Sequence, residues 1–174
     1  MTGTGRTAAA SSMEGGNGLK DGGAGDGGEA PLVRVFRKNK NARLPRYATG
    51  GAAGADVEAC LAAELVLAPG ERVKVPTGLA LEIPRGWEAQ VRPRSGLALR
   101  YGVTVLNAPG TIDSDYRGEL EILLVNTGGE PYTVRPGDRI AQLVFAPAPR
   151  VRLEDSELSG TTGRGGGGFG STGV

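Results

Sequence analysis

Hydrophobic and polar residues alternate with a period of two along most of the chain between Leu32 and Glu157. This pattern places apolar side chains on one face of a segment and polar side chains on the other, which is typical of a half-buried strand. Pro and Gly interrupt the segments at a spacing of roughly 8 to 12 residues. The pattern predicts about eight to twelve strands in a sandwich, barrel or jelly roll. Clear examples are LVRVFRK (32–38), ERVKVPTG (71–78), WEAQVRPR (87–94) and GDRIAQLVF (137–145).

Three stretches in the second half of the chain complete the expected strands. VTVLNAPGTID (103–113) and ELEILLVN (119–126) are expected to pair as a hairpin. We expect two strands from PYTVRPGDRIAQLVFAPA (131–148) and a last one from VRLEDSE (151–157). These assignments make the domain all-β, with a jelly roll as the expected arrangement.

The alternation lapses once, at SGLALRY (95–101), where helix-forming residues follow a serine that is suited to cap a helix. We therefore expect one short helix near 95–101, with Ser95 as its N-cap. The free amides at the start of such a helix would attract an anion beside Arg94. The alternative is a surface arginine next to an ordinary helix cap, and the segment by itself leaves both interpretations open.

The two ends of the chain differ from this middle part. Residues 1–31 consist mainly of Gly, Ala, Ser, Thr and scattered charges, and they hold too few large apolar side chains to offset the cost of ordering them. The segment from Ser159 onward is rich in glycine. We expect a disordered tail over 1–31, a folded domain over 32–158 and a flexible arm over 159–174.

Charge and residue usage narrow the chemistry. The chain carries 20 Lys and Arg against 19 Asp and Glu, a formal net charge of +1, so it lacks the basic surface that nucleic-acid binding needs. It has no histidine and a single cysteine, Cys60. This excludes Ser-His and Cys-His nucleophiles and metal sites built from several His or Cys ligands. Carboxylates must therefore carry any acid–base chemistry.

The sequence also predicts where the protein works. No apolar run approaches the about 20 residues that span a bilayer, and no apolar block of the secretory type occurs near the N-terminus. A single cysteine suits a reducing compartment. We expect no membrane association and a cytoplasmic location, with the nucleus or an organelle left open.

Candidate chemistry concentrates in TIDSDYRGEL (111–120), which holds two aspartates, a tyrosine and an arginine within a short stretch. We expect a strand that runs into a tight reversal at Asp113–Asp115. A carboxylate held there, away from bulk water, could orient a water molecule and accept its proton. The alternative is that DSD only caps a turn, and the stretch alone does not decide between the two.

The glycine-rich segment GRGGGGFGSTG (163–173) contains the G-x-G-x-x-G pattern of dinucleotide-binding folds. No strand–helix unit follows it, and Ser171 stands where a phosphate-binding loop would need lysine, so both assignments fail. The segment predicts instead a flexible arm whose glycine amides could wrap phosphates. The alternative is a tail of the type that binds single-stranded RNA.

Five segments resemble, in order and spacing, the five motifs of the trimeric deoxyuridine triphosphatase (dUTPase) family. They are AGADV (53–57), PRSGLA (93–98), NAPGTIDSDYRGEL (107–120), GDRIAQL (137–143) and RGGGGFGSTG (164–173). Val57 is a departure, since the family more often has leucine there. The resemblance implies a distorted jelly roll of the dUTPase-like β-clip type, assembled as a homotrimer with three active sites at subunit interfaces.

The implied reaction is hydrolysis of dUTP to dUMP and pyrophosphate by in-line attack of water on the α-phosphorus. This reaction keeps uracil out of DNA and supplies dUMP for dTMP synthesis. The resemblance also implies Mg²⁺ held by the phosphates and by water, with no direct side-chain ligand, which fits the preferences of this ion.

By the same resemblance, each expected site residue has a role. Asp113 would orient and deprotonate the water, and Asp56, Asp115 and Arg117 would support the site. Contacts to the phosphates are implied for Arg94, Ser95, Gly96 and Gln142, with closing contacts from Arg164, Ser171 and Thr172. The nucleoside would be held by Asn107, Gly110, Thr111 and Ile112 around the uracil edge, Tyr116 on the deoxyribose, and Phe169 with Gly170 from the arm.

Two other functions fit the same fold. A dCTP deaminase, or a relative with both activities, would release ammonia from dCTP. A nucleotide-binding regulator without catalysis would bind dUTP and leave it intact.

Overall fold

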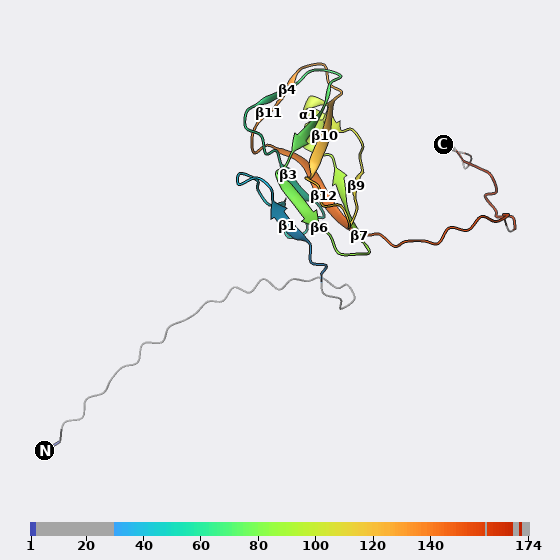
Figure 1. The fold of residues 1–174 in the computed structure, drawn as a ribbon, viewed down its shortest axis with the longest axis horizontal. Coiled ribbons are helices and arrows are strands. Elements are labelled where there is room, and N and C mark those ends of the chain that lie inside the picture. Colours follow the sequence, from blue (N-terminus) through green and yellow to red (C-terminus); the bar gives the residue numbers. More distant parts are fainter. Residues whose placement is uncertain (3–29, 159, 169–170, 172–174) are drawn as a thin grey trace. The chain divides into compact units, whose positions relative to one another are not determined.

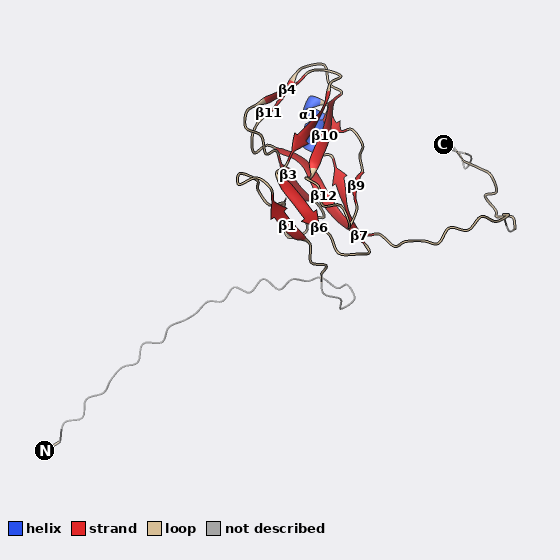
Figure 2. Cartoon of the chain, viewed as in Figure 1, coloured by secondary structure: helices blue, strands red, loops and turns tan. Residues whose placement is uncertain are grey.

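The computed structural model describes residues 1–2, 30–158, 160–168 and 171 of the 174-residue chain. The chain divides into two units, Met1–Ala30 and Pro31–Val174, and the helices and strands of the described residues lie in the second. Strands dominate this unit, as Figure 2 shows. The strands are β1 (Arg34–Arg37), β2 (Arg46–Tyr47), β3 (Ala55–Glu58), β4 (Leu65–Leu67), β5 (Arg72–Pro76), β6 (Leu79–Glu82), β7 (Trp87–Arg92), β8 (Val103–Val105), β9 (Gly110–Ile112), β10 (Glu121–Asn126), β11 (Tyr132–Val134) and β12 (Arg139–Pro147), and the helix is α1 (Ser95–Tyr101).

The strands form four antiparallel sheets. The largest has the order β2-β3-β12-β7-β9, and β12 lies between β3 and β7 in it (Figure 1). A three-stranded sheet has the order β5-β10-β8, and two pairs join β1 to β6 and β11 to β4. The expected all-β architecture with one short helix is therefore confirmed.

The register of the five-stranded sheet separates a core face from a polar face. Leu143 of β12 lies opposite Ala55 of β3 and Val91 of β7, and all three are buried. Residues directly opposite each other in a ladder share a face, and the next residue points the other way. Gln142 therefore shares the second face with its neighbours Asp56 and Arg92.

The core is one contiguous cluster of apolar side chains drawn from several sheets. The largest of its fully buried members are Leu67, Leu120, Ile122, Leu124, Ile140 and Leu143. Burying one such side chain contributes about 1.5–3 kcal/mol. The period-two pattern arises because each strand turns one face toward this cluster.

The helix begins one residue earlier than a Ser95 cap would allow. Arg94 is the N-cap, with an extended backbone and no side-chain capping bond, and its carbonyl accepts from the amides of Leu97 and Ala98, both at 3.1 Å. The expectation that Ser95 caps the helix was wrong, because the backbone of Arg94 already supplies the first acceptor. The helix ends at Tyr101 and is capped by Gly102, whose φ of 69° favours glycine.

One further expectation about strands was wrong in part and another was wrong. The expected pairing of 103–113 with 119–126 is confirmed for β8, which pairs antiparallel with β10, but not for β9, because Ile112 pairs with Ala89 of β7 in the five-stranded sheet. Residues 151–157 form no strand. Their alternation is strand-like, but a strand also needs a partner edge, and Leu153 is almost fully exposed to solvent.

Candidate active site

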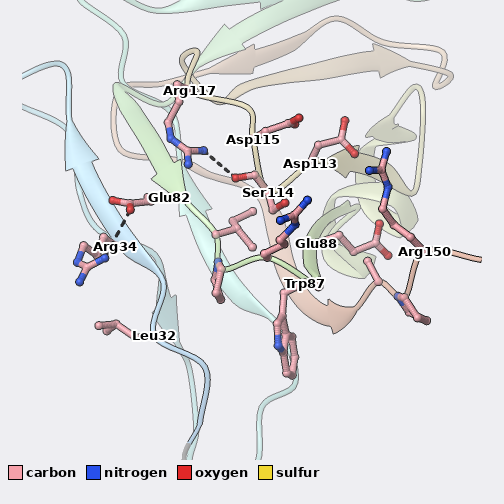
Figure 3. Close-up of a pocket in the computed structure, with 16 residues that line it drawn as sticks. Leu32, Arg34, Glu82, Trp87, Glu88, Asp113, Ser114, Asp115, Arg117 and Arg150 are labelled. Carbon is pink, nitrogen blue, oxygen red and sulfur yellow. Dashed lines mark hydrogen bonds and ion pairs between the residues drawn. The ribbon is translucent and has the colours of Figure 1, made fainter.

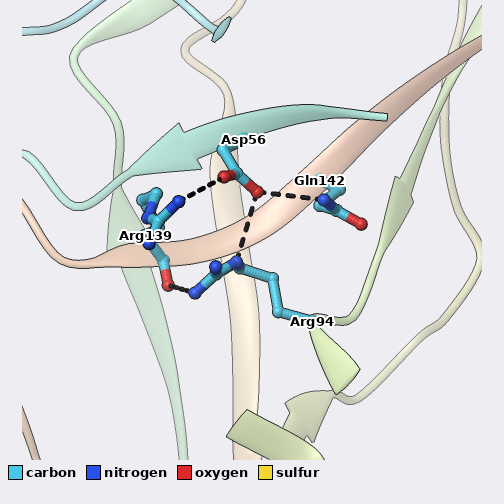
Figure 4. Close-up of polar contacts among 4 residues, drawn as sticks. All are labelled: Asp56, Arg94, Arg139 and Gln142. Carbon is cyan, nitrogen blue, oxygen red and sulfur yellow. Dashed lines mark hydrogen bonds and ion pairs between the residues drawn. The ribbon is translucent and has the colours of Figure 1, made fainter. Parts of the chain in front are cut away.

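Asp56 is the centre of a polar cluster on the polar face of the five-stranded sheet (Figure 4). Its carboxylate accepts from Arg94 Nε at 3.2 Å, Arg139 Nη1 at 2.9 Å and Gln142 Nε2 at 3.0 Å. Arg94 also donates from Nη1 to the carbonyl of Arg139 at 3.0 Å. The donors come from the start of α1 and from two positions in the first half of β12, so one carboxylate ties three parts of the chain together.

Asp56 keeps its negative charge despite being only 7% exposed. Burial by itself would raise the pKa of this carboxyl, but the hydrogen bond from Gln142 and the charges of Arg94 and Arg139 together outweigh it and hold the pKa below its ordinary value. A buried carboxylate with two arginine partners and a third donor is fully satisfied. It can therefore fix the directions in which Arg94 and Gln142 point.

Gly54 leaves room for the Gln142 side chain. A Cβ atom added to Gly54 would lie 3.2 Å from Gln142 Cβ and 3.3 Å from its Cδ. The carboxamide is thus held between the backbone of Gly54 and the carboxylate of Asp56. Two expected phosphate contacts, Arg94 and Gln142, are brought together here, next to Ser95 and Gly96 at the start of α1.

Arg139 is the residue of this cluster that sequence reasoning missed. It stands three positions before Gln142 in GDRIAQL, and a shift of register lies between Arg139 and Ala141 in the ladder with β3. The irregularity lets both side chains reach the same carboxylate. A basic residue at that spacing from Gln142 was the available signal.

The second part of the site surrounds Asp113, just after β9. Asp113, Asp115 and Arg117 line a cavity of about 960 Å³ (Figure 3). Four arginines and four carboxylates line this cavity, so it is strongly polar but balanced in formal charge; they are Arg34, Arg85, Arg117, Arg150, Glu82, Glu88, Asp113 and Asp115. Asp113 and Asp115 are exposed in the single chain, so the expected shielding of this carboxylate from water is not provided by the chain alone.

The residues expected around the nucleoside are near Asp113 in the chain. Gly110 is buried, and a Cβ atom there would lie 3.0 Å from Asn107 Nδ2 and 3.4 Å from Val91 Cβ, so glycine fits best. Thr111 and Ile112 lie in β9 opposite Gln90 and Ala89. The Tyr116 side chain is 44% exposed, and its hydroxyl donates to the carbonyl of Glu119 at 2.9 Å.

The two parts of the site lie at different levels of the same sheet. Gln142 of β12 lies opposite Arg92 of β7. Ile112 of β9 lies opposite Ala89 of β7, so Asp113, the next residue, lies near Glu88 along the direction of β7. About four residues of strand separate these levels, which corresponds to about 13 Å. One chain therefore does not place Asp113 beside Arg94 and Gln142.

The expected arm residues are only partly described. Arg164 donates from Nε to the carbonyl of Gly167 at 2.9 Å, and the amide of Ser171 donates to the carbonyl of Gly168 at 3.0 Å. Phe169, Gly170 and Thr172 lie outside the described residues.

The described residues were compared with the requirements of a metal site and of a membrane-spanning helix. Within the described residues, no group of three or more His, Cys, Asp or Glu side chains is placed to hold a metal ion. None of the helices there has the length and apolar character needed to cross a bilayer.

The antiparallel jelly roll, with arginines and carboxylates clustered on and beside its five-stranded sheet, defines an all-β protein with a polar candidate site. The dUTPase family model matches residues 40–173. The chain belongs to the dUTPase family.

Relatives of the chain are known in sequence and in structure. It is 61% identical over 140 residues to a deoxyuridine 5'-triphosphate nucleotidohydrolase of Anaeromyxobacter sp. (strain Fw109-5), covering 80% of this chain and 94% of the relative. Among solved structures, the Staphylococcus bacteriophage 80alpha dUTPase with dUPNHPP is 29% identical, with a TM-score of 0.76, 82% of this chain and 99% of that chain covered. A mutant dUTPase from phage phi11 of S. aureus, described with a structural Mg(II) ion, is 25% identical, with a TM-score of 0.67 and coverage of 74% and 98%.

Proposed function

We propose that the protein hydrolyses dUTP to dUMP and pyrophosphate by in-line attack of a water molecule on the α-phosphorus. The observation that carries the proposal is the 61% identity to a deoxyuridine 5'-triphosphate nucleotidohydrolase over nearly the whole of that relative. The geometry supports it, because the expected residues form two polar groups on one sheet.

Asp113 is the proposed base. It follows β9 directly, so the strand fixes its backbone, and it takes part in none of the ion pairs found among the described residues. Both carboxylate oxygens are therefore available to accept from a water molecule and take its proton.

Arg94 and Gln142 are the proposed contacts to the phosphates, with Ser95 and Gly96 beside them. Arg94 is held at Nε by Asp56 and at Nη1 by the Arg139 carbonyl, which leaves Nη2 to donate to a ligand. Phosphoryl transfer depends mainly on positioning and on neutralising charge, so a guanidinium that is already oriented lowers the barrier without rearranging.

A Mg²⁺ ion is proposed to enter with the triphosphate. The carboxylates around the Asp113 cavity are oxygen acceptors that suit the water shell of this ion, and Mg²⁺ commonly keeps several waters while it binds phosphates. When bound, the ion would neutralise part of the phosphate charge.

We further propose a homotrimer whose active sites are shared between subunits. Asp113 and the Asp56 cluster lie about 13 Å apart along β7. In addition, Asp113 is exposed in the single chain. A neighbouring subunit that brings its own Arg94 and Gln142 to Asp113 would complete the set of site residues and would also cover Asp113. The arm over 159–174 would then close the site. The proposed location is the cytoplasm.

The first experiment is to measure pyrophosphate release from dUTP, dCTP, dTTP and UTP in parallel, with Mg²⁺ and with EDTA. Release from dUTP alone, much reduced by EDTA, is expected. Ammonia release from dCTP, or binding of dUTP without hydrolysis, would instead support a deaminase or a regulator on this fold.

The second experiment tests the base. Asp113→Asn should lower kcat by at least about 100-fold while dUTP still binds, because the amide cannot accept the proton of the water. Turnover within a few fold of the wild type would remove Asp113 from this role.

A further inference from the structure

We propose that Gly118 is a positioning residue for Tyr116 and thereby sets how well the enzyme distinguishes deoxyribose from ribose. The inference rests on the proposed hydrolysis of dUTP, and on Tyr116 as the residue beside the sugar. Glycine has no side chain, so Gly118 acts only through the space that it leaves for Tyr116.

The Tyr116 ring occupies the space that a side chain at position 118 would need. A Cβ atom added to Gly118 would lie 2.8 Å from Tyr116 Cε2, and Cζ and Oη would be closer still. Atoms at such separations overlap, so any side chain at position 118 must displace the ring. A phenol ring moves as one rigid plate, so a small displacement of its edge moves all of it.

The backbone at Gly118 does not itself require glycine. Gly118 is not among the glycines with positive φ, unlike Gly102 and Gly137, where φ is 69° and 84°. An alanine at position 118 is therefore compatible with the local backbone. The empty space is needed by Tyr116, and the effect of filling it runs through that side chain.

The remaining contacts of Tyr116 keep the ring against Gly118. Its hydroxyl donates to the carbonyl of Glu119 at 2.9 Å, and its amide donates to the carbonyl of Asp113 at 3.2 Å. Arg117 donates from Nη1 to the carbonyls of Ser114 at 2.8 Å and Tyr116 at 2.9 Å. The turn is thus held on both sides of the ring, and displacement of the ring breaks its bond to Glu119.

The consequence concerns the sugar. A ring that packs on deoxyribose excludes a 2′-hydroxyl by contact, so its position decides the discrimination against UTP. In Gly118→Ala the ring moves off the Glu119 carbonyl, and the ratio of kcat/KM for dUTP to kcat/KM for UTP should fall by at least about tenfold. The matched control is Gly129→Ala, because Gly129 also lacks a positive φ and has no atom within 4 Å of an added Cβ.

The test compares wild type, Gly118→Ala, Tyr116→Ala, the double variant and Gly129→Ala with both nucleotides. If Gly118 acts through Tyr116, the double variant should match Tyr116→Ala in the dUTP to UTP ratio within about twofold, and Gly129→Ala should match wild type. A merely structural role for Gly118 would instead lower both activities together and leave the ratio unchanged. That outcome, or an equal further fall in the Tyr116→Ala background, overturns the inference.

Calorimetric binding of non-hydrolysable dUTP and UTP analogues repeats the comparison without turnover. Absence of hydrolysis in the wild type would refute the proposed function, while the binding ratios of the same variants would still decide the role of Gly118.

Discussion

Asp56 Oδ1 accepts a hydrogen bond from Gln142 Nε2 at 3.0 Å, across the ladder that joins β3 to β12. The same carboxylate also accepts from Arg94 and Arg139. It therefore holds separate segments of the chain together and also orients the side chains that donate to it. Loss of this carboxylate should therefore change both the stability of the protein and its activity.

Asp56→Asn should destabilise the protein and raise the KM for dUTP. The change removes the charge that Arg94 and Arg139 face, and because these arginines are partly exposed we expect a loss of about 1–3 kcal/mol in the free energy of unfolding. Chemical denaturation gives this value. Glu64→Gln is the matched control, since the exposed pair of Glu64 with Arg135, at 3.0 Å, should contribute less than about 1 kcal/mol. Equal effects of both substitutions would contradict the prediction.

The pH dependence of stability should carry the signature of Asp56. Its pKa is lowered in the folded protein from an ordinary value of 3.8. A lowered pKa means that the unfolded chain takes up the proton first, so the stabilisation is present above about pH 4 and is lost as pH falls through the folded pKa. Thermal unfolding between about pH 6 and pH 2 measures it, and Asp56→Asn should show a shallower decline than the wild type. Parallel declines would assign the acid sensitivity to other carboxylates.

Ending the chain after Thr162 should remove most of the activity without dissociating the proposed trimer. The truncation deletes Arg164 and Ser171, the described members of the expected closing contacts, so kcat should fall by at least about tenfold. Steady-state kinetics and light scattering after gel filtration measure the two properties. An unchanged kcat would show that the arm is no lid, and loss of the proposed trimer would give the arm a role in assembly.

Asn126→Ala should be among the more destabilising substitutions outside the site. This side chain is completely buried, donates from Nδ2 to the carbonyls of Leu67 at 2.9 Å and Glu130 at 2.8 Å, and accepts at Oδ1 from the amide of Gly128 at 2.9 Å. Its removal takes a partner from three backbone groups, at an expected cost of about 2–4 kcal/mol. Urea denaturation measures the loss, and Asn41→Ala, at an exposed position, should stay close to wild type.

Several features could be predicted from the sequence because they depend on local physics. The alternation in GDRIAQLVF predicted β12, and the lapse of alternation at 95–101 predicted α1. The grouping of Asp56, Arg94 and Gln142 was implied only through the family resemblance. Its geometry depends on the pairing of β12 with β3 and on the position of α1, which no local pattern encodes.

Other features depend on which distant segments meet. The stretch around Thr111 has the same pattern whether it pairs with β10 or with β7, and the choice of β7 is decided by packing across the whole domain. The contact between Arg139 and Asp56 could not be predicted for the same reason, because the two residues lie more than eighty positions apart in the chain. The exposure of Asp113 is a property of the folded subunit, and nothing in TIDSDYRGEL specifies what covers it.

The separation of β8 and β9 into different sheets has a consequence for folding speed. These strands are neighbours in the chain, yet β8 pairs with β10 and β9 pairs with β7. The pairing of β8 with β10 must close the long connection 106–120, and β10 must also pair with β5 from much earlier in the chain. Domains dominated by such distant pairings fold in about milliseconds to seconds, so a newly made chain should expose its apolar strand faces for longer than a helical protein of equal size.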